Sequence, residues 1–269
     1  WMEDRRIGRQ PGATVTRMQS ERDRMKTVAL AAATIVAVVS LAAPRCHASP
    51  VEGIAGWEGD GFDQGYGFAM AGVSLLDGRS ISIPLRVNGS YLYYNYGAAG
   101  EVIRVSGPGS AGLIGIRSTR PWGTMAALAG GEIRWEKRER EMPDGASSSV
   151  ARGGIIAQVE AEFAWSRRLR PFLLANYSGS ARYVYGRAGI RWQISNIDWR
   201  GPLTWSLGVE GVGQGSADTD AVQGGATVEC ALVPSRISLS ARGGYKDSVS
   251  SNGGRRHGGY VGVGLYRRF

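Results

Sequence analysis

The fold of this chain is decided by residues 81–94, which read ISIPLRVNGSYLYY. The odd positions, from Ile81 to Tyr93, are apolar or aromatic apart from one glycine, whereas the even positions include polar residues such as Arg86 and Asn88. Alternation with period two is typical of a β-strand that has one apolar and one polar face. The run exceeds the roughly 5–6 residues of an average strand in a globular protein. It therefore predicts a long strand in an extended sheet.

The same alternation recurs along the rest of the chain. Between 150 and 163, and again between 182 and 194, apolar residues alternate with charged residues, amides or tyrosines. Shorter copies occupy 203–212, 224–233, 236–246 and 258–269. Strands of about 9–11 residues with an apolar outer face and a polar lumen are what a transmembrane β-barrel requires.

We therefore expect an all-β fold, an antiparallel up-and-down transmembrane β-barrel of about 12 strands, or about 10 if weak segments merge. The weakest segments are 102–118, which Gly107-Pro108-Gly109 interrupts, and a strand near 53–58 that makes the number even. A soluble lipocalin-like barrel or a sandwich has the same period. Charges at mid-strand and aromatic residues near strand ends favour the transmembrane barrel.

Loop lengths predict an orientation. The longest connections lie at 136–149, 213–223 and 247–257, and counting back from the C-terminus places all three at one end of the barrel. Bacterial barrels have long extracellular loops, short periplasmic turns and periplasmic termini. These three connections are thus expected outside the cell, together with a short outer turn at 179–181.

The N-terminal region has the pattern of an export signal. A basic start at Met25-Lys26 is followed by an apolar run, 27–43, and by small residues that end at Ala48. This is the layout of a secretory signal peptide, and the apolar run is slightly short of the ~20 residues of a membrane span. We expect a disordered, non-native or mis-assigned extension at 1–24, a cleaved signal peptide at 25–48 and a barrel domain at 49–269.

Export changes the interpretation of charge and cysteine content. Removal of residues 1–48 lowers the formal net charge from +9 to about +5, which weakens the case for a nucleic-acid partner. Cys46 leaves with the signal peptide, so that Cys230 remains alone and cannot form an intramolecular disulfide.

Residues suited to catalysis are scarce. His257 is the sole histidine after residue 48, and the serines near it, such as Ser248, lie in a Ser/Asn/Gly segment that is typical of turns. One histidine and one cysteine cannot build a tetrahedral zinc site. We expect no catalytic residues, no metal site and no cofactor, and hence no enzyme.

The mature chain resembles the cellulose biosynthesis protein BcsS family of alphaproteobacteria. The resemblance rests on glycine- and aromatic-rich stretches and on a last strand that ends in an aromatic residue: Gly56-Trp57-Glu58-Gly59, residues 66–72, residues 91–96, residues 112–115 and Phe269. It implies an exported outer-membrane protein of cellulose production and no catalytic residues. Phe269 also resembles the terminal signal that barrel-assembly machinery reads, although Arg267 departs from that pattern.

These inferences combine into a functional hypothesis. We expect a non-enzymatic outer-membrane barrel that assists the export or surface placement of cellulose, since the lumen of such a barrel is largely filled by side chains. The alternatives are a small-solute porin and an outer-membrane lipid hydrolase that uses His257. Expected partners are outer-membrane lipid, lipopolysaccharide, the assembly machinery, and cellulose or its export components. The candidate contacts with polysaccharide in the lumen are Arg86, Glu160, Glu162, Tyr183, Tyr185, Arg187 and Arg191.

Overall fold

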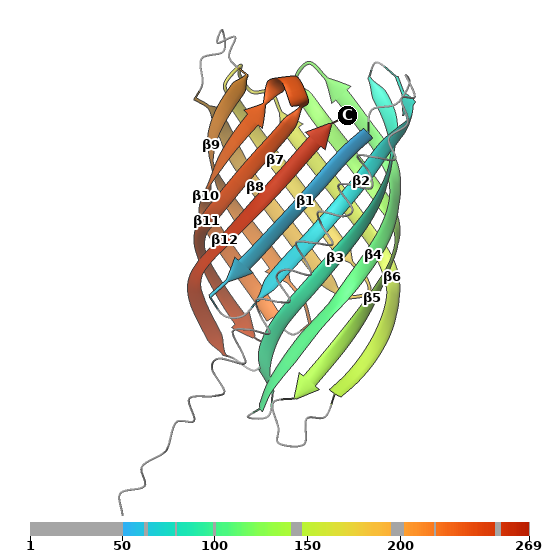
Figure 1. Ribbon diagram of the computed structural model, residues 1–269, viewed down its shortest axis with the longest axis vertical. Coiled ribbons are helices and arrows are strands. Elements are labelled where there is room, and N and C mark those ends of the chain that lie inside the picture. The colour runs from blue at the N-terminus through green and yellow to red at the C-terminus, as the bar shows by residue number, and fades with distance from the viewer. Residues whose placement is uncertain are drawn as a thin grey trace, which may run out of the picture.

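The computed structural model describes residues 51–61, 64–78, 80–98, 101–140, 147–194, 202–217, 219–250 and 254–268, which form a closed antiparallel barrel (Figure 1). Its strands are β1 (Val51–Asp60), β2 (Gly65–Asp77), β3 (Ile81–Ala98), β4 (Glu101–Arg120), β5 (Gly123–Arg140), β6 (Ser147–Phe163), β7 (Leu169–Ser178), β8 (Tyr183–Gln193), β9 (Leu203–Gly215), β10 (Thr219–Leu232), β11 (Ile237–Ser250) and β12 (Arg255–Arg268). The predicted 12-stranded barrel is confirmed. The predicted signal peptide, the extension at 1–24 and Phe269 lie outside the described residues.

Strand β1 closes the barrel. It pairs with β2 on one side and with β12 on the other, and Trp57 is the register partner of both Gly67 and Val263. This is one of the two strands that the sequence supported least, because its apolar alternation is short. Pairing on both edges satisfies its backbone groups, which a strand in lipid requires.

The barrel is apolar outside and polar inside. Outward side chains are exposed and apolar, as shown by Val87 at 58% and Ile155 at 68% relative exposure, whereas the inward side chains of Arg86 and Glu210 are buried. A soluble barrel has the opposite arrangement, so this pattern fits a lipid-facing wall and a polar lumen. Among the described residues no helix is long and apolar enough to cross a membrane.

We call the end at which β1 begins and β12 ends the terminal end, and the opposite end the far end (Figure 1). Outward aromatic residues gather at the terminal end, where the rings of Trp122 and Phe163 stack with centroids 6.2 Å apart. Exposed tryptophans at strand ends and in turns there include Trp165, Trp192 and Trp205. Such a belt is typical of a membrane interface.

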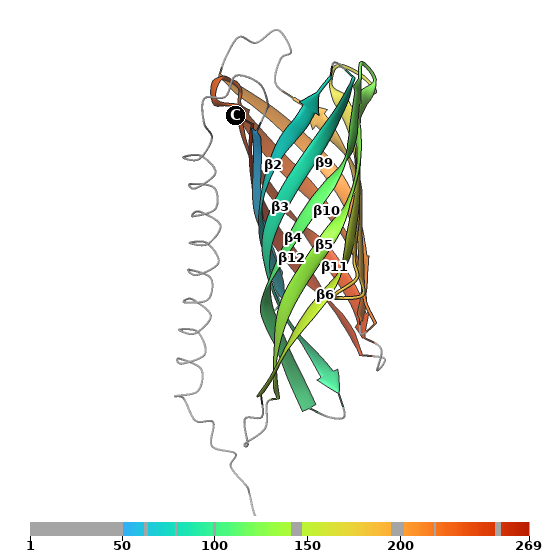
Figure 2. The same cartoon turned by 90° about the vertical axis from the view of Figure 1, so that its right-hand side faces the viewer.

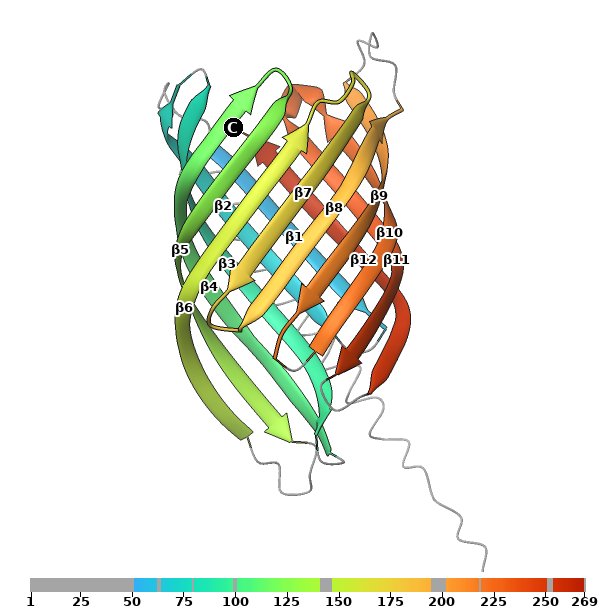
Figure 3. The same cartoon turned by 180° about the vertical axis from the view of Figure 1, so that it is seen from behind.

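The far end is uneven, because β3 to β6 extend well past their neighbours (Figures 1 and 3). The predicted loops at this end are therefore longer than the observed ones, because the strands continue into the predicted loop ranges. Pairing of β5 with β6 continues to Glu139 and Ser147, and pairing of β11 with β12 continues to Val249 and Arg255. The charged and Ser-rich sequences there lack apolar alternation, but their backbones still form ladder hydrogen bonds. All three segments do lie at one end, as expected, and the turn at 179–182 is short.

The interrupted segment 102–118 is part of one strand of 20 residues, β4. Its register with β5 is the same on both sides of the interruption, with Ser106↔Lys137 before it and Gly109↔Arg134 after it. Only the pairs at Gly107 and Pro108 are missing, and Pro108 has no N–H to donate. At Gly107 the backbones approach so closely that an added Cβ would lie 1.7 Å from the Trp135 carbonyl oxygen. Glycine is thus required here for strand pairing, and its presence does not end the strand. Figure 2 shows β4 running unbroken along the side of the barrel.

Candidate functional site

A row of register partners brings opposite charges together near the terminal end. Glu52 of β1 is paired with Gly72 of β2, Gly72 with Arg86 of β3, and Arg86 with Leu113 of β4. Because Gly72 has no side chain, the Glu52 and Arg86 side chains meet across β2. A Cβ at Gly72 would lie 3.0 Å from Glu52 Cγ and 3.1 Å from Arg86 Cγ.

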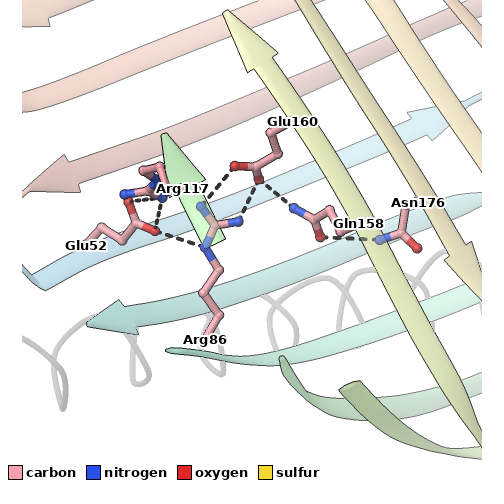
Figure 4. Close-up of polar contacts among 6 residues, drawn as sticks. All are labelled: Glu52, Arg86, Arg117, Gln158, Glu160 and Asn176. Atoms are coloured by element: carbon pink, nitrogen blue, oxygen red, sulfur yellow. Dashed lines mark hydrogen bonds and ion pairs between the residues drawn. The ribbon is translucent and has the colours of Figure 1, made fainter. Parts of the chain in front are cut away.

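Arg86 is the centre of the resulting network, and its side chain is only 2% exposed (Figure 4). Its Nε donates a hydrogen bond to Glu52 Oε1 at 2.9 Å. Its Nη1 and Nη2 donate to the two carboxylate oxygens of Glu160 on β6, at 2.6 and 3.0 Å. Two-pronged contacts of this kind are the strongest arginine–carboxylate geometry. A side chain of β3 is therefore tied inside the lumen to β6, past the two strands between them.

The network extends on both sides of Arg86. Arg117 of β4 donates from Nη2 to both carboxylate oxygens of Glu52, at 2.9 and 3.2 Å. Gln158 donates to Glu160 at 2.5 Å and accepts from Asn176 of β7 at 3.4 Å. We call these six residues the Arg86 network: Glu52, Arg86, Arg117, Gln158, Glu160 and Asn176.

A second network begins one inward position further along β6. Arg170 and Arg191 are register partners, and two like charges directly opposite each other destabilise a sheet. Glu162 offsets both charges, with oxygens 3.2 Å from Arg170 Nη1 and 3.0 Å from Arg191 Nη2. Arg191 also contacts Glu229 of β10 at 3.1 Å. The terminal end is thus cross-linked on both sides of β6.

Further inward contacts between aromatic and charged side chains lie on β7, β8 and β9. The guanidinium carbon of Arg191 lies 4.8 Å, and that of Arg187 5.3 Å, from the centroid of the Phe172 ring. Arg187 donates from Nε to Glu210 at 2.7 Å, and the Tyr260 hydroxyl donates to the other Glu210 oxygen at 3.2 Å.

The wall formed by β11, β12 and β1 carries two further ion pairs. Arg242 lies 2.8 Å from Glu58, and Lys246 lies 2.7 Å from Asp60. Opposite charges inside the barrel therefore occur as pairs, and the buried carboxylates and cations compensate one another.

Apolar side chains fill part of the lumen as well. Leu113, Ala126, Leu128 and Ile156, on β4, β5 and β6, form a buried cluster against which Ala111 packs. Leu113 is the register partner of Arg86, and both side chains are buried. On the side of the lumen formed by β3 to β6, side chains and hydrogen bonds thus pack together.

All seven candidate lumen residues are placed on the inner face, but they do not form one site. Their proposed contact with polysaccharide stays a prediction. Arg86 and Glu160 belong to the Arg86 network, Glu162 and Arg191 to the second network, and Arg187 to the pair with Glu210. Tyr183 donates from its hydroxyl to Gln214 at 2.7 Å, and Tyr185 lies two residues away on the same face.

Several partners were missed by the sequence interpretation. Glu52 and Glu58 lie on β1, one of the two weakest strands, and Arg117 lies beyond the glycine–proline interruption of β4. Each of the three lies an even number of residues from an inward-facing residue of its own strand. The alternation of the strand is therefore the signal that would have identified them.

The residues that a hydrolase would need are separated. His257 faces outward, where its ring stacks with that of Tyr245 at 6.2 Å, whereas the buried Ser248 hydroxyl donates to the Arg256 carbonyl inside the barrel. Cys230 is a free cysteine among outward apolar residues. Within the described ranges, no group of three or more His, Cys, Asp or Glu residues is placed to hold a metal ion.

Comparison with known families gives the identity. The sequence model described as cellulose biosynthesis protein BcsS matches residues 63–269, which covers β2 to β12 and most of the chain. The chain belongs to the BcsS family. Membership places this barrel among proteins of cellulose biosynthesis, as the glycine- and aromatic-rich stretches had suggested. No match to the chain was found among curated proteins.

Solved structures share the fold of this BcsS-family barrel. The β domain of the Bordetella autotransporter BrkA aligns with a TM-score of 0.52 and 13% identity, over 82% of this chain and 98% of that chain. The translocator domain of the autotransporter NalP from Neisseria meningitidis aligns with a TM-score of 0.49 and 13% identity, over 96% and 98%. At this identity the likeness to BrkA shows the fold alone, which is that of an outer-membrane β-barrel.

Proposed function

We propose that this BcsS-family barrel is a non-enzymatic accessory of cellulose production that resides in the outer membrane and assists the export or surface placement of cellulose. In this proposal the lumen does not conduct the glucan. Side chains close it near the terminal end, and the barrel acts as a scaffold.

The Arg86 network is the observation that carries the scaffold proposal. Its members come from β1, β3, β4, β6 and β7, and its central ion pair joins β3 to β6 inside the lumen, past β4 and β5. A passing glucan chain has to displace Arg86 from two carboxylates, which leaves Glu160 without its cationic partner and Glu52 with Arg117 alone, at considerable cost. Family membership supplies the link with cellulose.

The location and orientation belong to the same proposal. The outward apolar wall and the aromatic belt of the terminal end support residence in a bilayer. The long strand extension at the far end supports an extracellular far end and a periplasmic terminal end. Recognition of Phe269 by assembly machinery and contact with lipopolysaccharide remain predictions.

Gene deletion tests the proposal. In a cellulose-producing host we expect deletion to lower the amount of extracellular cellulose or its attachment to the cell surface, and the intact gene to restore it. A His257→Ala version should restore it equally well, because the proposal gives His257 no catalytic role. Unchanged yield and attachment in the deletion strain would remove the cellulose role.

The two alternatives make different predictions. A small-solute porin gives steady conductance in a planar bilayer, whereas the scaffold is silent. A lipid hydrolase loses its activity in the His257→Ala variant. The inward position of Ser248 and the outward position of His257 argue against a Ser–His pair formed by these two residues.

A further inference from the structure

A line of side chains follows the inner face of β2 and β3 from the middle of the lumen towards the far end. The rings of Phe68 and Tyr66 have centroids 5.8 Å apart and planes 23° apart. The rings of Tyr94 and Tyr96 have centroids 6.1 Å apart and planes 27° apart. Leu92 joins the two pairs, because it is the register partner of Tyr66 and lies two residues before Tyr94. We call these five residues the inner track.

The inner track leads out of the barrel. Tyr66 is 37% exposed although it faces the lumen, and Tyr94 and Tyr96 are partly exposed. Strand β3 continues to Ala98, whereas the adjacent hairpin turns between Asp60 and Gly65 (Figure 1). Tyr94 and Tyr96, the outer half of the track, therefore lie on the part of β3 that extends beyond the β1–β2 turn.

Polar groups flank the inner half of the track. Ser90 and Arg134 are the register partners of Gly109 on its two sides, and an added Cβ there would lie 3.0 Å from Ser90 Oγ and 3.8 Å from Arg134 Nε. Arg134 lies near Tyr66. Its Nε is buried and makes no hydrogen bond to any described residue. The guanidinium group of Arg134 therefore lies beside the track with one hydrogen-bond donor unused.

Polar groups flank the outer half as well. Arg138 interacts electrostatically with Tyr94 and Tyr96, and its Nη2 donates to Glu136 at 3.3 Å. Glu136 therefore offsets the charge of Arg138. A line of rings with hydrogen-bonding groups along its edge suits a ligand that is extended, neutral and amphipathic.

We propose that the inner track binds a linear, neutral β-linked glucan chain at the far-end mouth of the barrel. A sugar ring has an apolar C–H face that stacks on an aromatic ring and a rim of hydroxyls that Ser90, Arg134 and Arg138 can reach. The identity of the sugar rests on the proposed function, whereas the place of binding rests on the track.

The test uses the full barrel in detergent micelles, with cellohexaose as the probe and maltohexaose as the comparison sugar, measured by titration calorimetry. We expect cellohexaose to bind more tightly than maltohexaose. The double variant Tyr94→Ala, Tyr96→Ala should weaken cellohexaose binding by about tenfold or more, because two ring contacts are lost.

The matched control is the double variant Tyr91→Ala, Tyr93→Ala. It removes two tyrosines from the opposite face of the same strand and should leave cellohexaose affinity within about twofold of the unchanged barrel. Heat-modifiable migration on gels checks that both variants fold. Absence of cellohexaose binding, equal loss in both double variants, or equal affinity for maltohexaose would each overturn the inference.

Failure of this inference can be told apart from failure of the proposed function. If deletion of the gene lowers surface cellulose but the barrel binds no cellohexaose, only the inner-track inference fails. If cellohexaose binds and depends on Tyr94 and Tyr96 while deletion changes nothing, the cellulose role fails and the sugar site stands.

Discussion

At the scale of the residue, Arg86 is the side chain whose removal should matter most. It is buried and shared by Glu52 and Glu160, neither of which has more than about a third of its side chain exposed. Breaking a buried ion pair by removing one partner typically costs about 3–5 kcal/mol, because a buried charge is left uncompensated. Exposed pairs contribute about 0–1 kcal/mol.

Replacement Arg86→Met should therefore lower the free energy of unfolding by roughly 2–4 kcal/mol, measured by urea unfolding of the barrel in lipid vesicles. Arg170→Met is the matched control, because the Arg170–Glu162 pair is largely exposed and its loss should cost less than about 1 kcal/mol. Similar small losses in both variants would show that the Arg86 network does not stabilise the barrel.

Part of this network was predictable from the sequence. Strand alternation placed Arg86 and Glu160 on the inner face. Their contact was not predictable, because 74 residues separate them and it depends on the register and tilt of the two strands that lie between β3 and β6. The role of Gly72 in letting Glu52 reach Arg86 depends on register, which alternation alone does not determine.

At the scale of the element, close approach of strand backbones decides which glycines are required. In β5, an added Cβ at Gly130 would lie 1.8 Å from the Gly112 carbonyl oxygen, whereas an added Cβ at the adjacent Gly131 would meet nothing within 4 Å. The two residues share a strand and differ in the face to which a Cβ would point.

Gly130→Ala should thus disrupt the pairing of β4 with β5, while Gly131→Ala should be tolerated. We expect the first variant to lose about 2 kcal/mol or more of unfolding free energy, or to fail to fold, and the second to change it by less than about 0.5 kcal/mol. Urea unfolding and the yield of heat-modifiable protein measure this. Equal stability of the two variants would contradict the register of β4 with β5.

The elements themselves were largely predictable, but their ends were not. Apolar alternation identified the long strands because lipid outside and water inside impose it. Beyond the membrane both faces meet water and the alternation fades, so the charged segment near Lys137 resembled a loop although it continues β5. The Gly107-Pro108 interruption of β4 also suggested a break, but the ladder with β5 continues in the same register on both sides of it.

At the scale of the whole molecule, orientation is the feature that labelling can test. In a background in which Cys230 is replaced by alanine, Ala217→Cys places a thiol in the turn between β9 and β10 at the far end, and Arg167→Cys places one in a turn of the terminal end. Both positions are exposed. We expect a membrane-impermeant maleimide to label Ala217→Cys in intact cells, and Arg167→Cys only after the outer membrane is permeabilised. The reverse labelling pattern would show that the barrel has the opposite orientation in the membrane.

The central claim is that side chains close the lumen, and single-channel recording in planar bilayers tests it most directly. The unchanged barrel should give no steady conductance. The double variant Arg86→Ala, Glu160→Ala, which removes both ends of the ion pair at the centre of the Arg86 network, should give discrete openings. Steady conductance from the unchanged barrel, equal to that of the double variant, would contradict a closed scaffold and support a porin.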